Sequence, residues 1–234
     1  MLSILSIVLF SCNQKKGTIA NYSLFESKEY KVMKPKNKLA YLDSVYTSSN
    51  LLKNDSLNRN FLFNLSAEYY YLNAFKKSFL VSKNVFEMST KANDTLAVAK
   101  SNQYMGDCFE TTKKDSAYYF YKRAEKLYRL VGNYEKVAKM MFLKAYMLYF
   151  EGNYLESEIM VSDALQLLKK SNDIELIYSC YNLLGSNFEK LEEYVSALKY
   201  YLLAKRILPD LFKNDTDVTK INNYKITSEI NIAT

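Results

Sequence analysis

A triplet of one small, one large and one small residue recurs every 40 positions in this chain, and it constrains the fold more than any other feature. The second and third members follow the first by four and seven positions each time. This spacing puts all three on one face of an α-helix, and the small members let a neighbouring helix approach closely. The occurrences are Ala117-Tyr121-Ala124, Ser157-Val161-Ala164 and Ala197-Tyr201-Ala204.

A fixed period of this length is typical of a solenoid, in which each unit buries its apolar face against the next unit. The scarcity of turn-forming residues supports helices, since the 234-residue chain contains only 5 Gly and 2 Pro. Architectures built from many short strands need more of both. We therefore predict an all-α solenoid. Such a fold presents a binding surface and seldom carries chemistry of its own.

The segment 178–211 carries the clearest repeat, and it resembles the tetratricopeptide repeat (TPR) at every signature position of a 34-residue frame. The resemblance implies a right-handed α-solenoid of antiparallel helix pairs. Gly185 is expected where the two helices of the unit cross closely, and Pro209 is expected to end the second helix. The matching residues are Tyr181, Leu184, Gly185, Phe188, Tyr194, Ala197, Tyr201, Ala204 and Pro209.

The same frame divides the chain, from residue 39 to residue 234, into repeat units. Full units are expected at about 59–91, 99–131, 138–171 and 178–211, with partial units at 39–55 and 217–234. The last unit lacks a second helix, so we expect the chain to be truncated relative to a longer protein. Asp215 or Asp217 is expected to cap its helix. The spacing from Gly106 to Ala117 is one residue shorter than the equivalent spacing from Gly185, which predicts a tighter turn near Lys113.

The N-terminus is predicted to be a targeting segment. Residues 2–10 are almost wholly apolar, too few to span a bilayer but typical of a secretory signal, and Cys12 follows directly. Residues 9–12 resemble a bacterial lipobox, which implies that 1–12 form a signal peptide and that Cys12 carries the lipid anchor. The alternative is an ordinary signal peptide in which Cys12 is incidental. Residues 13–38 are expected to be a polar tether with a short helix near 22–29.

The composition argues against an enzyme. The chain contains no His, which excludes Ser-His-Asp catalysis and His-ligated metals, and none of its Gly residues forms a phosphate-binding loop. We expect no cofactor and no metal. The net charge is +7, but the basic residues alternate with acidic ones along the chain. Nucleic-acid binding would need a basic stripe with interleaved aromatic residues, and the sequence has no such stripe. Cys108 and Cys180 are expected to be small core residues rather than a disulfide pair.

The resemblance also implies a binding surface, because five positions of the first helix in each TPR unit line a concave groove. Four of these residues would form an exposed aromatic patch, unless neighbouring helices cover it: Phe142, Tyr146, Tyr149 and Phe150. The Lys and Asn clamp of TPR domains that bind chaperone tails is absent from the matching positions. The expected groove residues are Asn60, Phe63, Tyr70, Tyr71, Gln103, Asp107, Glu110, Phe142, Tyr146, Tyr149, Phe150, Asn182, Ser186 and Glu189.

These features together favour a non-enzymatic protein-interaction scaffold that is exported and anchored to a membrane of the cell envelope. The whole pattern resembles the sensor portion of bacterial signalling proteins, which join an exported TPR array to a histidine kinase or a DNA-binding output domain. The alternatives are a cell-envelope or nutrient-acquisition lipoprotein, and a receptor for a peptide or small ligand. The expected partner is a protein or peptide, and no nucleic acid is expected to bind through this chain.

Overall fold

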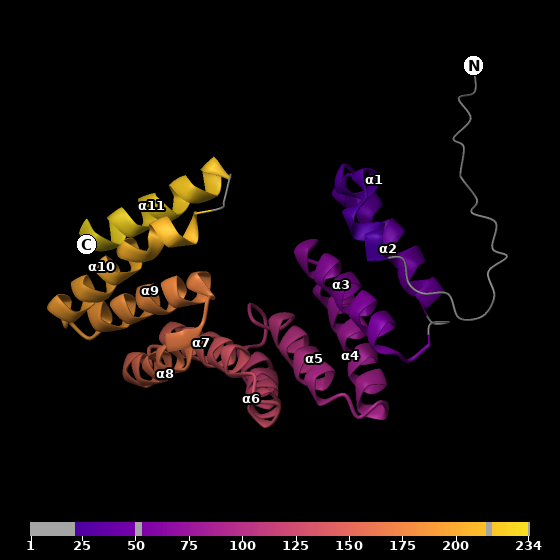
Figure 1. The fold of residues 1–234 in the computed structure, drawn as a ribbon, viewed down its shortest axis with the longest axis horizontal. Helices are drawn as coiled ribbons and strands as arrows, with labels where there is room; N and C mark the ends of the chain where they lie inside the picture. The colour runs from indigo at the N-terminus through magenta and orange to yellow at the C-terminus, as the bar shows by residue number, and fades with distance from the viewer. Residues whose placement is uncertain (1–21, 50–52, 214–216, 234) are drawn as a thin grey trace, which may run out of the picture.

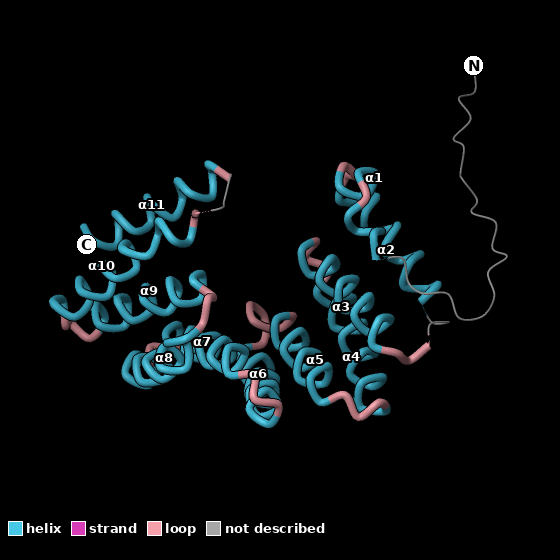
Figure 2. Tube along the Cα trace, in the orientation of Figure 1, coloured by secondary structure: helices cyan, strands magenta, loops and turns pink. Residues whose placement is uncertain are grey.

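The computed structural model describes residues 22–49, 53–213 and 217–233, and in these ranges the chain consists of helices joined by turns (Figure 2). Successive helices pack side by side and form an arc, with the first and last helices on opposite arms (Figure 1). None of the described helices is long and apolar enough to cross a membrane. Cys12 lies outside the described residues, as does the predicted signal segment.

The core of the arc is a run of antiparallel helix pairs, which confirms the predicted all-α solenoid. Because adjacent helices in the run pack mainly against each other, each unit completes the core of the previous one. The pairs are α3 (Ser56–Tyr71) with α4 (Phe75–Lys91), α5 (Thr95–Asp107) with α6 (Lys114–Leu130), α7 (Tyr134–Phe150) with α8 (Tyr154–Leu167), and α9 (Ile174–Lys190) with α10 (Tyr194–Leu211).

The 40-residue triplet lies in the second helix of its unit and is buried. All of its members are at most 4% exposed. Gly106 and Gly185, in the facing first helices, sit against Tyr121 and Tyr201. A Cβ atom on Gly106 would lie 2.6 Å from the Tyr121 ring, and one on Gly185 would meet the Tyr201 ring in the same way. The expected close crossing at Gly185 is therefore confirmed.

Most connections between helices are three-residue turns whose middle residue has a positive φ. Gly132 and Gly152 adopt this backbone without a side-chain penalty, and Asn73 and Asn93 tolerate it. Glu192 has φ +61 in the equivalent turn between α9 and α10, where a Cβ makes the conformation costly. The residue that ends such a turn can also cap the next helix: Asp94 and Asn133, for example, accept hydrogen bonds from the first turns of α5 and α7.

The connection after α5 differs from the expected one. α5 ends at Asp107, and residues 108–113 form successive turns before α6 begins. The predicted tight turn near Lys113 is therefore wrong. Since each helical residue advances about 100° around the axis, one missing residue cannot be absorbed inside a helix without rotating its buried face, so α5 stops early instead. Cys108 lies at this helix end, and both it and Cys180 are buried free thiols, as expected.

The helices that pack onto the solenoid begin nearer to the N-terminus than expected. A 3-10 helix (Tyr22–Glu26), α1 (Lys28–Lys31) and α2 (Pro35–Ser49) precede α3. Phe25 stacks on Phe61 with ring centroids 5.5 Å apart, and the Tyr30 hydroxyl donates a hydrogen bond to Glu68. The predicted tether over 13–38 is therefore wrong from residue 22 onward, because these aromatic side chains are buried in the first core.

The C-terminal end adds one further helix, α11 (Val218–Ala233), packed against α10. Asp217 accepts a hydrogen bond from the backbone N–H of Lys220, as expected for an N-cap. Tyr224 packs against Tyr178 and Phe212, which joins α11 to the preceding unit. Pro209 does not end α10, which continues to Leu211. A proline so near a helix end removes few backbone hydrogen bonds and is tolerated there.

Candidate binding site

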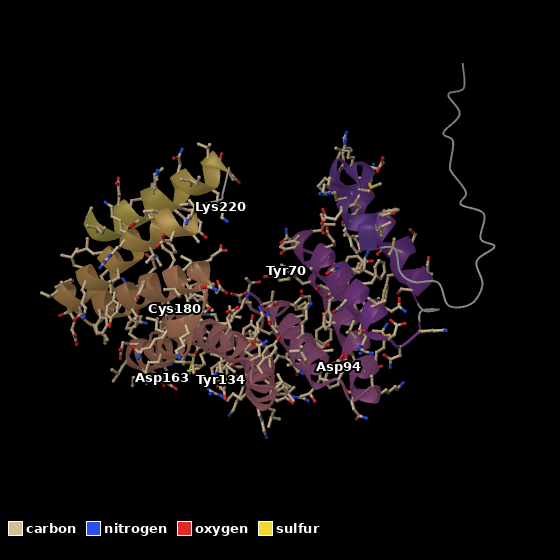
Figure 3. All side chains as sticks on the ribbon, viewed as in Figure 1. Tyr70, Asp94, Tyr134, Asp163, Cys180 and Lys220 are labelled. Atoms are coloured by element: carbon tan, nitrogen blue, oxygen red, sulfur yellow. The ribbon has the colours of Figure 1, made fainter. Side chains whose placement is uncertain are left out.

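A cavity of about 840 Å³ opens on the concave side of the arc and is lined mainly by α3, α5 and the start of α7. These are the first helices of three successive units. Figure 3 shows Tyr70, on α3, pointing toward the open centre of the arc. Six of the residues expected in the groove line this cavity, on its α3 and α5 walls. They are Asn60, Phe63, Tyr70, Tyr71, Gln103 and Asp107.

The polar residues on α5 are held by tyrosines of α6. The Tyr121 hydroxyl donates a hydrogen bond of 2.9 Å to Asp107 Oδ1, and the Tyr128 hydroxyl donates one of 3.1 Å to Gln103 Oε1. Burial raises the pKa of Asp107 to about 7, against the lowering effects of the Tyr121 hydrogen bond and the Lys139 charge. Near neutral pH the Asp107 carboxyl therefore carries only part of a negative charge.

Three lysines bring positive charge into the same cavity: Lys100 from α5, and Lys136 and Lys139 from α7. The Lys100 ammonium lies 4.3 Å from the Phe63 ring centroid and 5.5 Å from that of Tyr104. Burial lowers the pKa of Lys100, and the charge of Lys136 lowers it further. Among the described residues, no carboxylate lies within 4.0 Å of any of the three ammonium groups.

Two further charged residues at the cavity, Arg59 and Asp94, neutralise each other. Arg59, on α3, forms a 2.7 Å ion pair with Asp94 at the start of α5, and it also donates a hydrogen bond to Asn54. Burial of Asp94 acts to raise its pKa, but the hydrogen bonds from the Ala97 N–H and from Arg59, together with the Arg59 charge, lower it overall. This pair ties α3 to α5 at the edge of the cavity, and its Arg59 side chain is almost fully buried.

The predicted aromatic residues of α7 form a separate cluster outside the cavity lining. Phe142 stacks on Tyr146 with centroids 6.1 Å apart, and Phe150 contacts both Tyr146 and Tyr149. Phe142 and Tyr149 are half-buried against the core, whereas Tyr146 and Phe150 are 38% and 57% exposed. These four residues do not line the cavity, and their place in a binding groove stays a prediction.

The predicted groove residues of α9 are engaged within their own part of the solenoid. Ser186 and Glu189 both hydrogen-bond the Tyr201 hydroxyl, which comes from the partner helix α10. Asn182 accepts a hydrogen bond from Asn231 of α11. None of the three lines the cavity, and their place in a binding groove stays a prediction. Their polar groups satisfy buried hydroxyl and amide groups, a requirement that a repeat frame does not show.

Sequence reasoning missed the three lysines and Tyr104. The signal was present, since Lys100 and Lys139 occupy the frame position of Asn60 in the next two units. Lys136 and Tyr104 fall at positions outside the five that line the groove in the resemblance. Lys136 reaches the cavity because it lies in the first turn of α7, whose N-cap Asn133 also lines it.

Comparisons with known proteins support the fold alone. No protein-family model matches the chain, and no curated protein sequence matches it. The structure is similar to a solved structure titled "Crystal structure of BtubC (BKLC) from P. vanneervenii", with a TM-score of 0.63 and 14% sequence identity. The match covers 76% of this chain and 74% of that one. The chain therefore has a helical-repeat fold of a kind already seen in a solved protein.

Proposed function

We propose that this chain is a non-enzymatic interaction scaffold of the TPR type, and that the cavity on its concave side holds a segment of a partner protein. The observation that supports this most is the convergence of three consecutive first helices on one cavity of about 840 Å³. Its walls combine aromatic rings with charged and amide groups, which suits recognition of an extended peptide.

We further propose that the scaffold is the interaction or sensor portion of an exported, membrane-anchored signalling protein, with the anchor at Cys12. This proposal rests on the N-terminal sequence and the repeat pattern. Mass spectrometry of the mature N-terminus tests the anchor: a diacylated Cys12 is expected, and an unmodified Cys12 or cleavage elsewhere would contradict it. A cell-envelope or nutrient-acquisition lipoprotein would carry the same anchor. This alternative differs from a signalling protein in the partner that it binds.

A receptor for a small ligand is the second candidate, because the cavity volume lies within the range of about 300–1,000 Å³ typical of ligand sites. The two candidates differ in how much of the arc they use. A small ligand would contact residues of the cavity only, whereas a protein segment would extend beyond it along the concave side.

Site-specific photo-crosslinking tests the scaffold proposal. A photoreactive residue replaces Leu96, which is exposed at the cavity, and in a matched variant it replaces Lys126, which is exposed on the outer helix α6. In the native cell we expect one discrete protein adduct from position 96 and none from position 126. Equal labelling from the two positions would refute a concave binding surface.

A further inference from the structure

The cavity carries an excess of positive charge that the chain itself does not neutralise. Of its two carboxylates, Asp94 is paired with Arg59, and Asp107 accepts a hydrogen bond from Tyr121 and is only partly ionised near neutrality. Lys100, Lys136 and Lys139, named here the lysine cluster, have no carboxylate partner within 4.0 Å in the described part of the chain.

The lysine cluster is placed where charge repulsion costs stability. The charge of Lys136 acts on Lys100, and the burial of Lys100 removes part of the water that would screen its ammonium group. Lys136 also lies in the first turn of α7, the end of a helix that favours negative rather than positive charge. An anionic group bound between these side chains would relieve both effects and would form charge-assisted hydrogen bonds.

The side chains around the lysine cluster favour an anion that also carries apolar groups. Phe63 and Tyr104 lie beneath Lys100, and Tyr70 and Tyr71 form the neighbouring wall, where Tyr71 is 75% exposed. A ligand that reaches both areas needs carboxylate groups next to apolar ones. An extended peptide meets this need, because its side chains offer both kinds of group along one strand of main chain. The amide of Asn60, exposed on α3, can pair with that main chain.

We propose that the cavity binds an acidic segment of the partner protein, with its Asp or Glu side chains on Lys100 and Lys136 and an adjacent apolar residue against Tyr70 and Tyr71. This inference rests on the proposed scaffold function and adds the chemistry of the partner. The recognised groups are side-chain carboxylates within a segment, so a free C-terminus is not required.

Selection of binders from a random twelve-residue peptide library on the full chain tests the proposal. Recovered peptides are synthesised with blocked termini, and their affinities are measured by fluorescence anisotropy. Three proteins are compared: the wild type, the double variant Lys100→Gln/Lys136→Gln, and the control Lys122→Gln/Lys126→Gln. The control removes two exposed charges from the outer helix α6, so both variants have the same net charge. Thermal melts confirm that all three proteins are folded.

We expect peptides enriched in Asp and Glu whose affinity falls about tenfold or more in the Lys100/Lys136 variant, as for the loss of two charge-assisted hydrogen bonds. The control variant should bind as the wild type does, and rising salt should weaken binding. Replacing Glu with Gln in one recovered peptide should reproduce the loss.

Two results would overturn the proposal in different ways. Peptides that compete for the cavity but show no acidic enrichment, and bind the Lys100/Lys136 variant equally well, would refute acidic recognition and leave the scaffold function intact. Peptides that all bind elsewhere, unaffected by Tyr71→Arg at the cavity wall, would refute both. A single-stranded oligonucleotide that displaces every peptide and binds more tightly than they do would assign the lysine cluster to nucleic acid instead.

Discussion

Three of the four helix-pair units solve one packing problem in two ways, and the fourth, α3–α4, has Ser66 and Ser82 at the corresponding positions. At the crossing of the first and second helices, the α5–α6 and α9–α10 units pair a glycine with a tyrosine, Gly106 with Tyr121 and Gly185 with Tyr201. At the corresponding positions the α7–α8 unit has Ala145 and Val161, both fully buried. In the α7–α8 unit the first helix has the larger residue, Ala instead of Gly, and the second helix has the smaller one, Val instead of Tyr. The two changes in size compensate, so the helices can stay close in either case.

This difference also decides where polar chemistry appears on the inner helices. A buried tyrosine hydroxyl needs a hydrogen-bond partner, and the first helix supplies a carboxylate: Asp107 for Tyr121 and Glu189 for Tyr201. The side chain of Val161 has no polar group and needs no such partner. The choice of tyrosine for packing thus places an acidic group on the first helix, and in the α5–α6 unit that group lines the cavity.

The largest expected effect comes from adding a methyl group at a glycine crossing. Gly106→Ala should lower the free energy of unfolding by about 2 kcal/mol, because its Cβ would lie 2.6 Å from a ring atom of Tyr121. In a Tyr121→Val background the same substitution should be neutral or slightly stabilising, since alanine favours a helix more than glycine. Urea unfolding of the four proteins in this double-mutant cycle measures the coupling.

Gly185→Ala with Tyr201→Val is the matched cycle in the other unit, and it should give a coupling of the same sign. A coupling below about 0.5 kcal/mol in both units would contradict the size compensation between the two helices.

The next effect concerns the pH dependence of stability. The Asp107 carboxyl has a pKa of about 7 in the folded chain and about 4 when unfolded, so burial favours its protonated form. Its contribution to stability is therefore fully present below about pH 4 and is lost as the pH rises through 7. Asp107→Asn keeps an acceptor for Tyr121 without the charge. At pH 8 the variant should be more stable than the wild type by on the order of 1 kcal/mol.

Thermal melts of both proteins between pH 4 and pH 8 measure this difference. The two curves should converge toward pH 4, separate progressively between pH 4 and pH 7, and run parallel above that range. A constant offset at every pH would mean that the Asp107 carboxyl has an ordinary pKa in the folded chain.

The smallest effect is expected in the turn of the α9–α10 unit. Glu192 has φ +61, whereas the equivalent turns before α7 and α8 use Gly132 and Gly152 for the same backbone. Glu192→Gly should raise the stability by about 0.5–1 kcal/mol, because it removes the clash of Cβ in the left-handed region. The gain is measured by urea unfolding, and Glu193→Gly, one residue further on, serves as the control and should not stabilise.

Sequence reasoning predicted the solenoid well because its strongest signals are local and repeated. The buried triplet and the glycine crossings each follow from helix geometry and residue size. The candidate site was harder, because the frame gives each residue a position but not its hydrogen-bond partners. Three of the residues that it assigned to the groove, Asn60, Phe63 and Tyr70, line the cavity. It did not show that Tyr201 engages Glu189, or that lysines of two units gather at the cavity.

The central claim is that the concave surface formed by α3, α5 and α7 holds the partner, and hydrogen–deuterium exchange on the full chain with its crosslinked partner tests it most directly. Binding should slow exchange in 56–71, 95–107 and the first half of 134–150, and should leave the outer helices α4, α6 and α8 unchanged. Protection confined to the outer helices, with none in the three inner ones, would contradict the account.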